Sequence, residues 1–314
     1  MKAFALTTTD SPASLIDLSV PETAPGALRV AKRAATVNGF DVLHATGMFT
    51  TMMPHILPTV VGRDFAGVVE AVGEGRSDVS VGDEIFGFVS YAPPLHDGSF
   101  AEQIVSADLV VARKPAGVSF AAAASLGLAG VAALDLVDAV DPKPGDVIVV
   151  AGATGGVGSI AVQLAAQRGA TVVATARTDD EVTFVRGLGA SETVDYSVGD
   201  VAEQLRSRYP AGIDGLIDAV NRDEAAAALA ALVRDGGRLA TTQGTADAEG
   251  LATRNVQATN IVASPTPEKL AALAASAASG DLVVHIQQTF ALADIQAALA
   301  AFSAGTIGKI AVEA

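Results

Sequence analysis

The chain has 314 residues, of which 50% are hydrophobic, and its 35 acidic and 20 basic residues give a formal net charge of -15. A chain of this length can bury a sizeable core and is expected to form two domains. The net charge disfavours binding to nucleic acid or to an acidic membrane surface, and the absence of cysteine excludes disulfides and thiolate metal ligands.

The first residues, MKAFALTTTDSPASL, lack the long apolar core of a signal peptide. No stretch of about 20 apolar residues is free of charges and glycine turns, so the sequence predicts no membrane span. We therefore expect a cytoplasmic protein.

Residues 1–118 are predicted to form a β-rich domain. Glycines and prolines separate short apolar runs at 27–37, 65–73, 84–89 and 101–115. Short strands at this spacing indicate a small barrel-like or sandwich-like fold.

Residues 119–258 follow a different pattern, in which expected strands alternate with expected helices. Strands are predicted at 146–152, 171–176, 212–220 and 237–243, and helices at 159–169, 179–190 and 223–237. Such alternation is typical of α/β proteins with a doubly wound parallel sheet and helices on both faces. Residues 259–314 contain two further predicted helices and are expected to extend the sheet and return to the first domain.

A glycine-rich turn, ATGGVG at 153–158, lies between the first strand and the first helix of the α/β region. Gly155 and Gly158 match the last two glycines of the G-x-G-x-x-G pattern, and Ala153 replaces the first. Glycines permit the tight turn and let backbone N–H groups approach a pyrophosphate, while the helix N-terminus offers unpaired donors. The context predicts a dinucleotide site; the alternative is a turn that binds nothing.

The end of the second predicted strand indicates which dinucleotide is bound. An acid there binds the ribose hydroxyls of NAD, whereas an arginine without an acid accommodates the 2′-phosphate of NADP. Arg177 follows this strand and has a fixed fork of donors for phosphate, so we expect NADPH. Asp179, Asp180 and Glu181 follow at once and would repel the phosphate if they turned inward; alternatively, Arg177 is only an exposed arginine.

Three segments together resemble the zinc-independent quinone oxidoreductases of the medium-chain dehydrogenase/reductase superfamily. They are GRDFAGVVEAVG at 62–73, VGDEIFGF at 81–88 and AGATGGVGSIAVQLA at 151–165, and the resemblance extends to the closing GKIAVEA. It implies a GroES-like barrel domain formed by both chain ends and a Rossmann domain. It also implies a cofactor in the cleft between the domains, with its nicotinamide facing the first domain, and a homodimer.

Zinc enzymes of this superfamily use a cysteine, a histidine that follows a glycine, and an acid as ligands. Here Asn38 stands in the cysteine region and Arg63 stands in the place of the histidine, and a guanidinium cannot ligate zinc. The four histidines have no short metal-binding spacing, so no metal site is expected.

The resemblance also implies which residues form the site. Asn38 would face nicotinamide and substrate, with its amide as the candidate donor to a developing oxyanion; alternatively it is a turn residue before Gly39. The residues expected around the pyrophosphate are Thr154, Gly155, Gly156, Val157 and Gly158. Those expected around the adenosine 2′-phosphate are Thr175, Arg177 and Tyr196. Those expected along the rest of the cofactor are Ala219, Val220, Gln243, Gly244, Val262 and Ser264.

The segment 47–57, GMFTTMMPHIL, is expected to form a loop beside the substrate pocket. Met48, Phe49 and Met52 suggest an adaptable apolar wall, although methionines also pack beneath loops.

Three positions depart from the residues that relatives often carry. Glu181 replaces a lysine that supports NADPH binding, Ala132 replaces a threonine, and Phe49 replaces a pocket tyrosine. Because Phe49 has no hydroxyl, a proton would have to come from water or from another group.

The expected function is transfer of hydride from NADPH to a quinone or to the β-carbon of an α,β-unsaturated carbonyl compound. An enoyl or alkenal reductase of a biosynthetic pathway shares every motif named above. An NADPH-binding sensor without turnover is a third interpretation, because the tyrosine and the threonine are missing.

Overall fold

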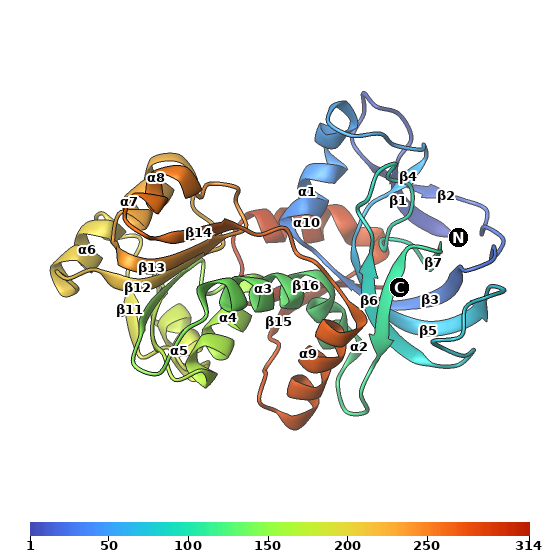
Figure 1. Cartoon of the computed structure of the whole chain (residues 1–314). Coiled ribbons are helices and arrows are strands. Elements are labelled where there is room, and N and C mark those ends of the chain that lie inside the picture. The colour runs from blue at the N-terminus through green and yellow to red at the C-terminus, as the bar shows by residue number, and fades with distance from the viewer. The chain divides into compact units, whose positions relative to one another are not determined.

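The computed structural model describes residues 1–314, which divide into two compact units. The first unit comprises residues 1–129 and 265–314, and the second comprises residues 130–264. The boundaries predicted at 118 and 258 lie earlier in the chain than these divisions. Figure 1 labels the elements of both units.

The first unit contains two β-sheets. The larger has the order β15 (Ile286–Ala291), β16 (Lys309–Glu313), β3 (Leu28–Thr36), β5 (Asp64–Val72), β6 (Glu84–Val89) and β8 (Leu109–Arg113), and β7 (Gln103–Ser106) also pairs with β3. The smaller has the order β2 (Ser14–Asp17), β1 (Lys2–Leu6) and β4 (Thr59–Val60). Strand pairs are antiparallel apart from β15 with β16.

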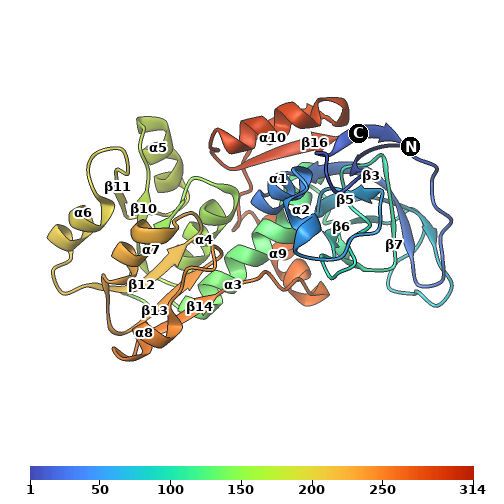
Figure 2. The same cartoon turned by 90° about the horizontal axis from the view of Figure 1, so that it is seen from above.

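The C-terminal strand β16 is largely buried and lies between β15 and β3 in the larger sheet. Its Ala311 and Val312 lie opposite Thr36 and Ala35 of β3, just before Asn38 in the sequence. Helix α10 (Ile295–Ser303) lies along β16 in Figure 2 and packs apolar side chains against it. The C-terminal return therefore brings the end of the chain beside the candidate residue Asn38.

The other helical segments of the first unit are short, with the exception of α9. They are α1 (Gly39–Ala45), α2 (Phe120–Ser125) and α9 (Pro267–Ser279), with 3-10 turns at Met48–Thr51 and Leu292–Asp294 and a π-helical turn at Leu126–Gly130. Ser119 and Thr266 begin α2 and α9 because each side chain accepts a backbone hydrogen bond from the first helical turn.

The second unit is built on one parallel sheet, as the sequence predicts. Its order is β11 (Glu192–Val194), β10 (Thr171–Thr175), β9 (Val147–Ala151), β12 (Ile213–Asp218), β13 (Val233–Thr241) and β14 (Gln257–Asn260). The helices are α3 (Val131–Val140), α4 (Gly156–Gln167), α5 (Asp179–Gly187), α6 (Val201–Arg208), α7 (Asp223–Ala230) and α8 (Ala248–Ala252).

Helices cover both faces of this sheet. Figure 1 shows α3 and α4 on one side and α7 and α8 on the other. Val149, Val173 and Leu216 point from the strands toward α6 and α7, where Leu205 and Leu229 complete an apolar cluster. Burial on both faces explains why the strand VIVVA is a continuous run of apolar residues rather than an alternating one.

One boundary differs from the sequence prediction. The helix predicted over 223–237 ends at Ala230, and β13 begins at Val233. Val233 is fully buried and lies opposite Ile213 in the parallel sheet. Pairing with β12 therefore overrides the helical preference of the alanine-rich segment.

One helical segment, Phe120–Val140, is long and apolar enough to cross a membrane, although none was expected from the sequence. In its most apolar 18-residue stretch, 72% is buried inside the protein. The core helix of a protein that does not enter a membrane is buried in the same way.

Candidate functional site

The turn after β9 leaves the N-terminus of α4 without a side-chain cap. Gly155 is the N-cap residue, and the first helical hydrogen bond runs from Ser159 N to Gly155 O at 2.9 Å. The N–H groups of Gly156, Val157 and Gly158 precede that bond and have no acceptor within the helix. These donors and the positive end of the helix dipole favour an anion at this turn.

Two glycines of the turn have different structural roles. A Cβ added to Gly158 would lie 2.1 Å from Gly152 O, so α4 approaches the turn too closely for any side chain. A Cβ added to Gly155 would meet only Gly152 O, at 3.5 Å. Gly158 therefore permits close packing, and the space beside Gly155 is free for a phosphate. This arrangement fits a dinucleotide pyrophosphate.

Thr175, at the end of β10, fixes the turn from the neighbouring strand. Its hydroxyl accepts hydrogen bonds from Gly152 N at 2.9 Å and Ala153 N at 3.4 Å. The side chain is buried, so its hydroxyl contributes to the shape of the turn.

The carboxyl ends of β12 and β13 bring together the residues predicted to lie along the cofactor. Gln243 Nε2 donates to Ala219 O at 3.0 Å, which bridges the two strand ends. Gly244 adopts a left-handed conformation with φ of 73°, and Val220 is exposed. Asp218, which the sequence analysis did not select, accepts from Val220 N at 3.0 Å and fixes this edge.

Val262 and Ser264 follow β14 at the end of the second unit. Val262 is exposed, and Ser264 N donates to the carboxylate of Asp135 at 3.0 Å.

The predicted adenosine end contains a group of three interacting side chains. Arg177 Nη2 lies 3.3 Å from Glu181 Oε1, and the Tyr196 hydroxyl donates to both carboxylate oxygens of Glu181 at 3.3 and 3.2 Å. The Arg177 guanidinium also lies 5.4 Å from the centre of the Tyr196 ring. Of the three acids that would repel a 2′-phosphate if they turned inward, Glu181 does turn inward.

In the first unit, Asn38 belongs to a buried polar network. Its Nδ2 donates to Asp64 Oδ2 at 2.9 Å and to Asp41 Oδ2 at 3.2 Å, and its Oδ1 accepts from Lys309 Nζ at 2.6 Å. Thr36 Oγ1 donates to Asp64 Oδ2 at 2.8 Å. Asn38 can therefore donate to a substrate only if one of its two bonds to carboxylates opens.

Burial sets the protonation behaviour of this network. It raises the pKa of Asp41 to about 7, with the neighbouring Asp64 carboxylate adding to the rise. Burial also raises the pKa of Asp64, against the opposing effect of the Lys309 ammonium, and lowers the pKa of Lys309. The two carboxylates and the ammonium are thus held together away from solvent, where each depends on the others for charge compensation.

Arg63, which stands where zinc enzymes have a histidine ligand, is fully buried and organises the adjacent loop. Its Nη1 donates to Ser90 O at 2.8 Å and its Nη2 to His44 Nδ1 at 3.4 Å. Burial, with Arg63 nearby, lowers the pKa of His44 to about 3, so the imidazole is neutral and its Nδ1 accepts. A guanidinium and an ammonium in this network do not fit a zinc ion, and no three potential metal-ligating side chains come together.

The predicted pocket loop contributes to an aromatic cluster. Phe49 stacks on Phe40 with ring centres 4.7 Å apart, and Tyr91 lies 5.8 Å from the Phe40 ring. Met48 and Met52 are exposed beside this cluster, at 52% and 68%. Tyr91, which the sequence analysis missed, brings a hydroxyl-bearing ring next to Phe40, the ring on which Phe49 stacks.

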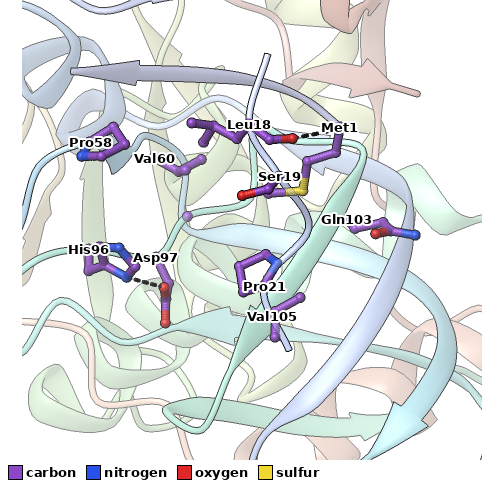
Figure 3. A pocket seen from close by; sticks show the side chains of 11 residues that line it. Met1, Leu18, Ser19, Pro21, Pro58, Val60, His96, Asp97, Gln103 and Val105 are labelled. Atoms are coloured by element: carbon purple, nitrogen blue, oxygen red, sulfur yellow. Dashed lines mark hydrogen bonds and ion pairs between the residues drawn. The ribbon is translucent and has the colours of Figure 1, made fainter. Parts of the chain in front are cut away.

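The first unit also contains a cavity that is lined by other residues. Figure 3 shows it between the N-terminal strand and the segment that carries His96 and Asp97, which are joined at 2.7 Å. Its lining contains none of the predicted site residues.

Lys309, Asp41 and Asp64 were also missed by the sequence analysis, although Asn38 and the segments GKIAVEA and GRDFAGVVEAVG were noted. A lysine in an otherwise apolar C-terminal strand, KIAV, was the available signal, because a buried lysine requires a polar partner.

Comparison with known proteins agrees with this architecture. The family model for the alcohol dehydrogenase GroES-like domain matches residues 24–116, and the model for zinc-binding dehydrogenase matches residues 156–265. These matches and the fold define a member of the medium-chain dehydrogenase/reductase superfamily.

Within that superfamily, the chain belongs to the zinc-independent, quinone-oxidoreductase-like proteins. The quinone oxidoreductase from Coxiella burnetii superposes with a TM-score of 0.89 at 26% identity, covering 100% of this chain and 99% of that one. In the present chain, the buried guanidinium of Arg63 and the buried ammonium of Lys309 are cations in the polar network and do not suit a zinc ion.

Two curated relatives are oxidoreductases. The 2-haloacrylate reductase from Burkholderia sp is 32% identical over 66% of this chain and 62% of that protein. The chloroplastic NADPH-dependent alkenal/one oxidoreductase from Arabidopsis thaliana is 33% identical over 73% of this chain and 58% of that protein. The chain thus spans less than two thirds of the length of these relatives.

The close approach at Gly158 predicts a large difference between two glycine substitutions. Gly158→Ala should lower the free energy of unfolding by about 1–3 kcal/mol, because the overpacking outweighs the helix-forming preference of alanine. Gly155→Ala is the comparison variant and should lower it by only about 0.5 kcal/mol, because alanine is a poorer N-cap than glycine but its Cβ meets no close atom. Urea unfolding measures both, and equal stability of the two variants would contradict the packing role.

The raised pKa of Asp41 predicts a pH-dependent effect of Asp41→Asn. The folded protein retains a proton that the unfolded chain releases, so the wild-type contribution to stability falls as pH rises from about 4 to about 7. The variant lacks this loss, so its stability relative to the wild type should increase across that window. Urea unfolding across the window tests this, with exposed Asp10→Asn as control; a constant difference for Asp41→Asn would contradict it.

Proposed function

We propose that the protein is an NADPH-dependent, zinc-independent oxidoreductase that transfers hydride to a quinone or a related electron-poor carbonyl compound. The observation that carries the proposal is the uncapped N-terminus of α4 in a glycine turn, with Arg177 after β10 and Tyr196 after β11. The turn offers backbone donors to a pyrophosphate, and Arg177 offers charged donors to a 2′-phosphate.

A second candidate is reduction of an activated carbon–carbon double bond. The relatives named for 2-haloacrylate and for alkenals and alkenones support it. The two candidates place the same demands on the dinucleotide site and differ in the acceptor.

NADPH would supply the hydride, and the protein would supply binding, orientation and electrostatic stabilisation. The backbone N–H groups of Gly156, Val157 and Gly158 would bind the pyrophosphate. Gln243 would keep the ends of β12 and β13 together along the bound dinucleotide.

Asn38 remains the proposed catalytic amide. Lys309 donates to its Oδ1 and polarises the amide, which strengthens its Nδ2–H groups as donors. If one bond to a carboxylate opens, that N–H can stabilise the negative charge that develops on the acceptor oxygen. The buried carboxylates would return the amide to its starting position.

The aromatic cluster favours a planar acceptor. Phe40 and Phe49 provide a stacked pair, and Met48 and Met52 provide adaptable apolar surface beside it. A quinone ring has a flat face that can stack on such a wall, whereas a short alkenal offers less area. This comparison ranks the quinone first.

A homodimer is part of the proposal and rests on the family resemblance, and the cytoplasmic location remains a prediction from the sequence. Gel filtration with light scattering tests the dimer.

The first test compares cofactors and acceptors. Oxidation of NADPH and of NADH, followed at the nicotinamide absorbance, should be measured with a 1,4-quinone, a 2-alkenal and a cyclic enone. We expect NADPH-dependent turnover that is fastest with the quinone. Faster turnover of the alkenal would select the second candidate. Tight NADPH binding without turnover of any acceptor would contradict both and favour a sensor.

The role of Asn38 predicts a loss of turnover without a loss of cofactor binding. Asn38→Ala should lower kcat by about 10²-fold, the order observed when one oxyanion donor is removed, with little change in the Kd of NADPH. Thr36→Val is the matched control, because it removes a partner of Asp64 but leaves Asn38 in place. Equal kcat losses per folded molecule in both variants would assign Asn38 a structural role only.

A further inference from the structure

Glu181 lies beneath two polar side chains that face solvent. The exposed fraction of its side chain is 7%, whereas that of Arg177 is 52%, and Tyr196 is 42% exposed. The carboxylate accepts from Arg177 N at 2.6 Å, from the Arg177 guanidinium and from the Tyr196 hydroxyl. An anion that approaches Arg177 and Tyr196 therefore meets donors that a carboxylate already occupies.

The contacts of Glu181 exceed what helix capping requires. Thr178 is the N-cap of α5, and its hydroxyl accepts from Glu181 N at 3.2 Å. In a capping box the acid at the third helical position would return a bond to the N-cap backbone; here the carboxylate instead binds Arg177 N, one residue earlier. The bonds to the Arg177 guanidinium and to Tyr196 hold side chains, not the helix end.

The charge of this carboxylate has opposite effects on two ligands. A ribose with free 2′- and 3′-hydroxyls brings donors, which a carboxylate accepts with its two oxygens. A 2′-phosphate brings negative charge and must compete with Glu181 for the same guanidinium. The negative charge of Glu181 also acts on Tyr196, because burial and then the Glu181 carboxylate raise the pKa of the Tyr196 hydroxyl.

We propose that Glu181 is a selectivity residue of the adenosine-ribose pocket. It competes with a 2′-phosphate for Arg177 and Tyr196 and thereby narrows the preference for NADPH over NADH, so that the protein binds both dinucleotides. This inference rests on the proposed function, because it concerns the same cofactor site.

The test is direct binding of each dinucleotide, measured by calorimetry without an acceptor. The wild-type Kd values of NADPH and NADH should lie within about tenfold of each other. Glu181→Gln keeps an oxygen for the bond from Arg177 N and removes the charge. It should tighten NADPH binding by about five- to tenfold, the order that loss of one nearby like charge produces, and weaken NADH binding by about two- to fivefold, because the amide keeps only one acceptor oxygen for the ribose hydroxyls.

A double-mutant cycle separates competition for Arg177 from general repulsion. Arg177→Ala should weaken NADPH binding, and Glu181→Gln added to Arg177→Ala should then have a much smaller effect than in the wild type. Asp180→Asn, at an exposed position of the same helical turn, is the matched control and should leave the ratio of Kd values unchanged.

The outcomes distinguish this inference from the proposed function. Binding of neither dinucleotide to the wild type would overturn both. Binding of both, with a ratio that Glu181→Gln does not change, would overturn the role of Glu181 alone. An equal weakening of both ligands by Glu181→Gln, with a lowered melting temperature, would show that Glu181 serves only to hold the start of α5.

Discussion

The hydrogen bond from Lys309 Nζ to Asn38 Oδ1 joins residues that are 271 positions apart, and the first unit depends on it. An ammonium buried in a protein interior loses its hydration and must find charged or polar partners nearby. Lys309 finds them in Asn38, in the carbonyl of Val37 at 2.9 Å and in the Asp64 carboxylate at 3.6 Å. The same contacts hold β16 in the sheet beside β3. Residues 265–314 therefore form part of the same unit as residues 1–129.

In the second unit, by contrast, polar groups are left without partners inside the protein. There, polar backbone groups at the start of α4 have no internal partner, because Gly155 supplies no cap. Gly158 and Thr175 fix this arrangement, one by allowing α4 to approach and the other by holding the turn. Unpaired donors kept in place by a rigid sheet are suited to an anionic ligand, since no internal bond must break when the ligand arrives.

Local patterns determined how much of this was predictable. The strands and helices around the glycine turn were correctly predicted because each has a continuous apolar run or a helical spacing of its own. β11 was not predicted, since a three-residue strand carries no periodicity, and α7 was extended too far because strand pairing at Val233 is non-local. The network around Asn38 was missed for the same reason: Lys309 and Asp64 reach it only through the sheet.

The adenosine end shows where sequence reasoning about charge reaches its limit. Asp179, Asp180 and Glu181 are consecutive acids in one helical turn, and composition alone does not distinguish them. The structure exposes Asp179 and Asp180 and buries Glu181, because successive helical residues point about 100° apart. The one acid that turns inward is also the one that binds Arg177. The position of Glu181, and not the number of acids in the turn, therefore decides which charge acts on the ribose pocket. For this reason net charge is a poor guide to which dinucleotide such a pocket prefers.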